Sequence, residues 1–177
     1  MKKCNIPIAG IVMIVLAGFL LSIPGWLRNY DGFAGQLLIA SPQLEDPNFQ
    51  RTVVLVTAHN PLMARGYVLN RFLSDPDYGD NRRWGGPLKF NEQRILTRNS
   101  PVNSSPIANT GLSIAEPDSD YERSETDLFF TGYASWGIGQ LEKEIEAGDW
   151  QIRTFTPAIL DMPYQTMWNS LSVEEKP

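Results

Sequence analysis

The N-terminal stretch limits the possible folds more than any other part of the chain. Residues 4–27 hold no Asp, Glu, Lys or Arg and are rich in Ile, Leu, Val and Met. Because a helix rises about 1.5 Å per residue, about 20 apolar residues cross a hydrocarbon core of about 30 Å. The sequence therefore predicts an N-terminal transmembrane helix. Residues 1–30 form the anchor, with residues 5–27 in the membrane, and residues 31–177 form a separate domain.

The flanking charges predict the orientation of this single span. Lys2 and Lys3 precede the apolar stretch, and Arg28 is the only basic residue directly after it. Positive charge is retained on the cytoplasmic side of a membrane, so we expect the domain on the non-cytoplasmic side. A cleaved signal peptide is the alternative. Its apolar region is usually shorter, about 7–15 residues, but residues 32–34 (Gly-Phe-Ala) have the small-x-small pattern of a cleavage site.

The rest of the chain has the length and composition of one globular domain. Hydrophobic residues make up 42% of the chain and charged residues 20%, which is typical of a folded protein. Cys4 is the only cysteine, so the domain has no internal disulfide and must be stable through packing alone. The net charge is −5, and the positive residues are scattered among carboxylates. Because no basic stripe is present to displace counterions from phosphates, nucleic acid is disfavoured as a partner.

Short apolar and β-branched runs predict a largely antiparallel sheet. Residues 36–40 form an apolar run that ends before a Ser-Pro pair, and residues 51–57 are rich in β-branched side chains, so we expect these two strands to pair. An Asn-Pro turn then leads back into a third strand, 66–70. Further strands are predicted at 128–134 and 150–155.

Two helices and one irregular region complete the predicted domain. Residues 140–147 place apolar side chains at i and i+4 and end at a glycine, and residues 163–171 form a closing helix. A tight bend is expected at the Trp-Gly-Gly-Pro of residues 84–87. Residues 97–127 are the least apolar part, so we expect a long irregular excursion with at most one short strand, at 111–114.

Several motifs along the domain are specific enough to indicate a bacterial protein family. They are Gly-Gln-Leu-Leu-Ile-Ala-Ser-Pro at 35–42, His-Asn at 59–60, Leu-Asn at 69–70, Gly-Gly-Pro at 85–87 and Gly-Tyr-Ala-Ser-Trp-Gly-Ile-Gly-Gln-Leu-Glu at 132–142. In order and spacing these motifs resemble the YqgE/AlgH family, over roughly residues 32–172.

The resemblance implies a fold but not an activity. It implies an α+β domain whose branched, largely antiparallel sheet closes into a pseudo-barrel, with a few helices packed outside. The family has no agreed biochemical function, and its label as a transcriptional regulator is loosely grounded. The family pattern alone places five residues in one ligand or interaction cleft: Asn70, Gly85, Gly86, Trp136 and Gln140.

No residue has a pattern that predicts catalysis, a metal or a cofactor. His59 is the only histidine, and the sequence offers no convincing partner for it, so we interpret it as structural or on the surface. Ser135 does not lie in the Gly-x-Ser-x-Gly pattern of a strained nucleophile. Asp75, Asp77 and Asp80 lack the spacing of an EF-hand loop and are expected to form a solvated acidic loop.

These observations favour a membrane-tethered domain that acts without catalysis, through contacts with a protein partner. The predicted anchor, the acidic charge and the lack of a catalytic set support this interpretation. Two alternatives stay open. One is a cytoplasmic-type regulator of gene expression, which the family label suggests; the other is a cryptic hydrolase or ligand-binding enzyme that uses the cleft near Asn70 and Gly85.

Overall fold

A computed structural model of the chain describes residues 32–74, 77, 79–99, 101, 103–117 and 121–172. The anchor predicted within residues 1–30 lies outside this range, so it stays a prediction. In the part of the chain that is described, no helix has the length and apolar character needed to cross a bilayer.

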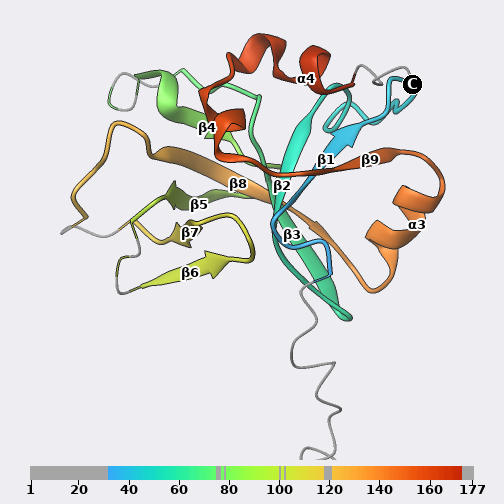
Figure 1. Ribbon diagram of the computed structural model, residues 1–177, viewed down its shortest axis with the longest axis horizontal. Helices are drawn as coiled ribbons and strands as arrows, with labels where there is room; N and C mark the ends of the chain where they lie inside the picture. Colours follow the sequence, from blue (N-terminus) through green and yellow to red (C-terminus); the bar gives the residue numbers. More distant parts are fainter. Residues whose placement is uncertain are drawn as a thin grey trace, which may run out of the picture. The chain divides into compact units, whose positions relative to one another are not determined.

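The described residues form one nine-stranded sheet with two α-helices beside it (Figure 1). The strand order is β6-β7-β5-β8-β3-β2-β1-β9, and β4 pairs with β8 off this path. Every pairing is antiparallel except that of β4 with β8. The strands are β1 (Gln36–Ala40), β2 (Val53–Asn60), β3 (Met63–Val68), β4 (Arg82–Trp84), β5 (Leu88–Thr97), β6 (Ser104–Ile107), β7 (Leu112–Ala115), β8 (Leu128–Trp136) and β9 (Trp150–Thr154). The prediction of a branched, largely antiparallel sheet is confirmed.

Strand β8 is the branch point of this sheet. It pairs with β5 from Leu128 to Thr131 and again at Tyr133, whereas its last residues, Ala134 to Trp136, pair with β3. Gly132 lies in the middle of the strand with φ 72, a backbone conformation that favours glycine. The sheet therefore divides into a β5–β7 part and a β1–β3 part on either side of β8, which together form a half-barrel (Figure 1).

The apolar strands have both faces buried, which explains their unbroken hydrophobic runs. Along β1, Leu37 and Ile39 face one core cluster, and Leu38 and Ala40 face a second cluster on the other side of the sheet. The second cluster also contains Leu141, the buried residue of the short helix α3 (Gln140–Glu146). Each of these side chains is at most 1% exposed. The predicted i, i+4 apolar face of the helix is therefore directed toward the sheet.

The C-terminal part of the described chain covers the first core cluster. A 3-10 helix, η2 (Pro157–Asp161), precedes helix α4 (Tyr164–Ser172), and α4 contacts β1. Met167 of α4 is buried in the cluster, and Trp168 and Leu171 pack against it partly exposed. The closing helix predicted at 163–171 is thus observed, as α4, with Met167 directed into the core.

One prediction about strands was wrong, and two further strands, β4 and β5, were not predicted. Residues 97–127 hold two strands, β6 and β7, and not one at most. Strand β6 escapes recognition because it is polar and contains Pro106, which is tolerated at the edge of a sheet where no partner needs its amide. Strand β5 was also missed, because its first residues are mostly exposed and polar and only Ile95, Leu96 and Thr97 at its end are buried.

Candidate functional site

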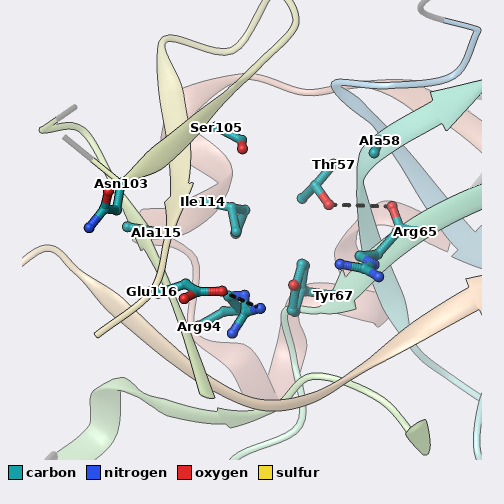
Figure 2. A pocket seen from close by; sticks show the side chains of 10 residues that line it. All are labelled: Thr57, Ala58, Arg65, Tyr67, Arg94, Asn103, Ser105, Ile114, Ala115 and Glu116. Carbon is teal, nitrogen blue, oxygen red and sulfur yellow. Dashed lines mark hydrogen bonds and ion pairs between the residues drawn. The ribbon is translucent and has the colours of Figure 1, made fainter. Parts of the chain in front are cut away.

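A hollow lies between the two parts of the half-barrel (Figure 2). Its volume is about 320 Å³, and we call it the half-barrel pocket. Cavities of about 300–1,000 Å³ are typical of small-molecule sites. Strands β2 and β3 line one side, and β5, β6 and β7 line the other. The lining residues are Thr57, Ala58, Arg65, Tyr67, Arg94, Asn103, Ser105, Ile114, Ala115 and Glu116.

Alternation along β3 directs two polar side chains into this pocket. Arg65 and Tyr67 are two residues apart, so they lie on the same face of the strand, with Gly66 between them. On β2 the register shifts between Val56 and Ala58, so that Thr57 is an extra residue at a β-bulge. Bulges commonly redirect a side chain near a site, and here Thr57 donates its hydroxyl to the carbonyl oxygen of Arg65 at 3.4 Å.

Tyr67 places a buried hydroxyl in the pocket. The residue is 1% exposed, and its hydroxyl has no hydrogen-bond partner among the described residues. Burial raises the pKa of Tyr67 to about 12, although the nearby charges of Arg65 and Arg94 lower it. The phenol is therefore protonated at neutral pH and can donate a hydrogen bond to a ligand.

Arg65 contributes a positively charged guanidinium group to the pocket. Its guanidinium lies over the ring of Tyr133, 4.4 Å from the ring centroid, so one face of the planar group is covered. Its Nε is buried and has no hydrogen-bond partner among the described residues. An orphaned buried donor is costly and rare in folded proteins, so it marks a position where a ligand atom would be stabilised.

Arg94, in contrast, is already neutralised. Its Nη2 lies 2.8 Å from a carboxylate oxygen of Glu92 and 2.8 Å from one of Glu116. The side chain of Glu116 is 67% exposed, which places this ion pair at the mouth of the pocket. The lining contains no histidine or cysteine, and its carboxylate, Glu116, is paired. The pocket can therefore bind an acceptor group, but it offers no nucleophile with a base beside it.

Two of the five predicted cleft residues lie together, in a different hollow. Trp136 and Gln140 line a cavity of about 210 Å³ between β8, α3 and β9, with Glu144 and Trp150. The Glu144 carboxylate accepts hydrogen bonds from the indole N–H groups of Trp136, at 2.7 Å, and Trp150, at 2.8 Å, and from the amide of Gln140 at 2.9 Å. We call these four residues the Glu144 cluster. Its polar groups satisfy each other.

The other three predicted cleft residues line neither hollow and have structural explanations. Asn70 accepts from the backbone N–H of Val53 at 2.8 Å and donates to the carbonyl of Arg51 at 2.9 Å. Gly85 and Gly86 lie against the backbone of β8. A Cβ on Gly86 would be 2.2 Å from the carbonyl carbon of Tyr133, so no larger residue fits there. A ligand role for any of the five stays a prediction.

His59 has the partner that the sequence did not reveal, so the prediction that it lacks one was wrong. Its Nδ1 accepts from the backbone N–H of Phe33 at 2.9 Å, and its Nε2 lies 2.9 Å from a carboxylate oxygen of Glu142. The ring also stacks on Phe33, with centroids 5.2 Å apart. Because Nδ1 accepts, the proton of the neutral ring lies on Nε2 and is donated to Glu142. Ser135 likewise donates its hydroxyl to the Ala64 carbonyl, at 3.0 Å.

Nothing in the described part of the chain indicates a metal centre. Its His, Cys, Asp and Glu side chains form no group of three or more that could hold an ion. Asp75 and the side chain of Asp80 lie outside the described residues, so the acidic loop stays a prediction.

Arg65 and Tyr67 were missed by sequence reasoning. The predicted strand began at residue 66, whereas β3 is Met63–Val68, so Arg65 fell outside it. An arginine flanked by small residues and followed by buried apolar ones was the available signal, because a charged residue inside such a run needs a specific explanation.

Comparison with known proteins relates the chain to one family. A family model described as AlgH-like (DUF179) matches residues 37–174. A UPF0301 protein of Chlorobium luteolum is 32% identical over 155 residues, covering 77% of this chain and 82% of that protein. A UPF0301 protein of Mycolicibacterium gilvum is 31% identical over 159 residues, covering 76% and 78%.

Two solved structures have a similar fold. The solution structure of the AlgH protein from Pseudomonas aeruginosa has a TM-score of 0.64 and 26% identity, and the match covers 84% of this chain and 88% of that one. A crystal structure of a protein from Corynebacterium diphtheriae has a TM-score of 0.66 at 23% identity, covering 82% and 88%. The second likeness concerns the fold alone.

Proposed function

We propose that this chain, which belongs to the AlgH-like family, is a non-catalytic domain that is held at a membrane and binds a protein partner through its half-barrel pocket. The relatives are named as UPF0301 proteins, so their names state no activity. The function is therefore argued from the pocket and from the predicted anchor.

One observation carries the binding role. Two buried donors, the Nε of Arg65 and the hydroxyl of Tyr67, belong to residues that line the same pocket, and neither atom has a partner among the described residues. Such groups are stabilised when a ligand brings an acceptor. Catalysis is less well supported, because a covalent mechanism needs a nucleophile within hydrogen-bond reach of a base and the lining does not provide that pair.

The position and size of the pocket favour a protein partner. Ser105 belongs to β6, the strand at the end of the sheet among the described residues, and Glu116 is mostly exposed, so the pocket opens beside an edge strand. A volume of about 320 Å³ is at the low end for small-molecule sites, which suits one side chain or a chain end of a larger partner.

The tether is tested by membrane fractionation of cells that make the full chain or a variant without residues 1–30. We expect the full chain in the membrane fraction, because residues 5–27 prefer hydrocarbon to water, and the shortened variant in the soluble fraction. Mass spectrometry of the N-terminus serves as the control for cleavage. Full-length chain in the soluble fraction with its N-terminus intact would contradict the tether.

The binding role is tested by photocrosslinking in cells. A benzophenone amino acid replaces Ser105 at the pocket, and a matched variant carries it at Thr154, which is exposed on β9 and does not line the pocket. We expect a protein adduct from position 105 that is lost when Arg65→Ala is added, and that reforms when the identified partner and the full chain are purified and mixed. An adduct that is insensitive to Arg65→Ala, or equal at position 154, would contradict the proposal.

A further inference from the structure

We infer that the group which the half-barrel pocket receives is a carboxylate, bound in the plane of the Arg65 guanidinium and hydrogen-bonded by the Tyr67 hydroxyl. This inference rests on the proposed binding role and names its chemistry. Figure 2 shows both side chains directed into the hollow from β3.

The first step is the polarity of the pocket. Both polar atoms without partners can donate: a guanidinium has donors only, and the protonated phenol of Tyr67 can donate as well as accept. A ligand that satisfies the Arg65 Nε must therefore present an acceptor atom. Ammonium and guanidinium groups are excluded, since Arg65 would repel them.

The second step is the amount of charge. Of the two guanidinium groups in the lining, Arg94 lies between the carboxylates of Glu92 and Glu116, and Lys89 also pairs with Glu92 at 3.4 Å, so these two cations and two carboxylates balance each other. No ion pair of Arg65 exists among the described residues. One positive charge is therefore left to balance. A carboxylate carries one negative charge, whereas a phosphate monoester carries about −1.5 to −2 at neutral pH and would lie close to Glu116 uncompensated.

The third step is the geometry of Arg65. Tyr133 covers one face of its guanidinium, so the strong approach is edge-on. The buried Nε offers one donor at this edge, and the adjacent terminal nitrogen offers a parallel one. Two parallel donors match the two oxygens of a carboxylate, which a lysine at the same position could not do. The Tyr67 hydroxyl then supplies a third hydrogen bond.

The test is a titration of the full chain in an uncharged detergent, followed by nuclear magnetic resonance of arginine Nε–H groups, with the Arg65 signal assigned from its loss in Arg65→Lys. Four probes are compared: an acetylated dipeptide with a free C-terminal carboxylate, N-acetyl-glutamate α-amide, whose only carboxylate is in the side chain, the fully amidated dipeptide, and inorganic phosphate. The first two probes distinguish a chain end from an acidic side chain as the source of the carboxylate.

We expect a saturable shift of the Arg65 signal with at least one carboxylate probe and none with the amidated peptide. Arg65→Lys and Tyr67→Phe should each weaken carboxylate binding about tenfold, which calorimetry measures for both variants. The matched controls Arg98→Lys and Tyr164→Phe, which lie outside the pocket lining, should bind as the unaltered chain does. Circular dichroism of each variant reports whether it is folded.

The outcomes separate this inference from the proposed function. Phosphate binding as tightly as a carboxylate, or no probe binding to a folded chain that still crosslinks at position 105, overturns the carboxylate and leaves the binding role in place. Carboxylate binding that Arg65→Lys and Tyr67→Phe do not weaken also overturns it. Carboxylate binding without any crosslinked partner supports the site and contradicts the protein-binding role.

Discussion

The half-barrel pocket and the Glu144 cluster are two polar regions of the same domain, and they differ in whether their polar groups have hydrogen-bond partners. In the Glu144 cluster one carboxylate accepts two indole N–H groups and an amide, so the hydrogen bonds close within the protein. In the half-barrel pocket, the Arg65 Nε and the Tyr67 hydroxyl find no partner among the described residues. We call the first network closed, because its hydrogen bonds link parts of the protein to each other, and the second open, because its donors are available to bind a ligand.

The largest effect on stability should come from removing the carboxylate of the Glu144 cluster. Glu144→Ala removes the acceptor of both indoles, which link β8 and β9 to α3, and leaves two N–H groups unpaired. We expect the free energy of unfolding to fall by about 2–4 kcal/mol, measured by urea denaturation. Glu146→Ala, an exposed residue on the same helix, is the control and should change stability by less than about 0.5 kcal/mol. An equal change in the free energy of unfolding in the two variants would show that the hydrogen bonds of the Glu144 cluster do not stabilise the fold.

A second closed site, at His59, should behave like the Glu144 cluster. His59→Ala leaves the backbone N–H of Phe33 without its acceptor and removes the hydrogen bond to Glu142. We expect a loss of about 1–3 kcal/mol in unfolding free energy. Asn at this position keeps a side-chain acceptor for the Phe33 N–H, so His59→Asn should lose less. If His59→Asn and His59→Ala lower the free energy of unfolding equally, the hydrogen bond from the Phe33 N–H is not the source of the lost stability.

High pH should destabilise the domain through Tyr67. Its folded-state pKa of about 12 lies above the ordinary value of 10.0, so between these values the unfolded chain has released a proton that the folded chain retains. The contribution of Tyr67 to the free energy of unfolding is therefore constant below about pH 10 and falls as the pH rises toward 12. From about pH 9 to about pH 11 the contribution of Tyr67 should amount to about 1 kcal/mol. Urea denaturation at the two pH values should show this difference disappearing in Tyr67→Phe; a loss of the same size in the variant would assign it to other groups.

The smallest effect on stability should come from removing the Tyr67 hydroxyl of the half-barrel pocket at neutral pH. Tyr67→Phe removes a buried hydroxyl that has no partner among the described residues, so stability should stay the same or rise by up to about 1 kcal/mol. Tyr121→Phe is the matched control. Its hydroxyl donates to Asp127 at 2.8 Å, so the variant should lose about 1 kcal/mol. Thermal unfolding compares the two. A clear destabilisation by Tyr67→Phe would mean that the hydroxyl is satisfied in the free protein.

Much of the fold follows from local sequence patterns. The apolar run at residues 36–40 coincides with β1, the β-branched run overlaps β2, and the i, i+4 pattern before Gly148 gives α3. Strands β5 and β6 could not be recognised, because one has a mostly exposed first half and the other is a polar edge strand. Such strands are stabilised by their neighbours in the sheet and carry little signal of their own.

The candidate site was less accessible to sequence reasoning than the fold. The family pattern grouped Asn70, Gly85 and Gly86 with Trp136 and Gln140. In the structure Asn70 bonds to the backbone at the start of β2, Gly85 and Gly86 lie against the backbone of β8, and only Trp136 and Gln140 share a hollow. Residues that form close backbone contacts and residues that bind ligands can stand in similar motifs. A motif therefore marks a position as special without giving the reason.

The amino-acid sequence alone indicated the family, the approximate positions of five strands and the positions of both α-helices to within about one residue, because these depend on residues that are neighbours in the chain. The tertiary structure alone identified the pocket, because an orphaned donor can be recognised only when all of its surroundings are known. Tyr67 faces Ser105 and Ile114 across the hollow, from strands about 40 residues further along the chain. Whether a buried polar atom finds a partner depends on contacts of this long-range kind, and no local pattern records them.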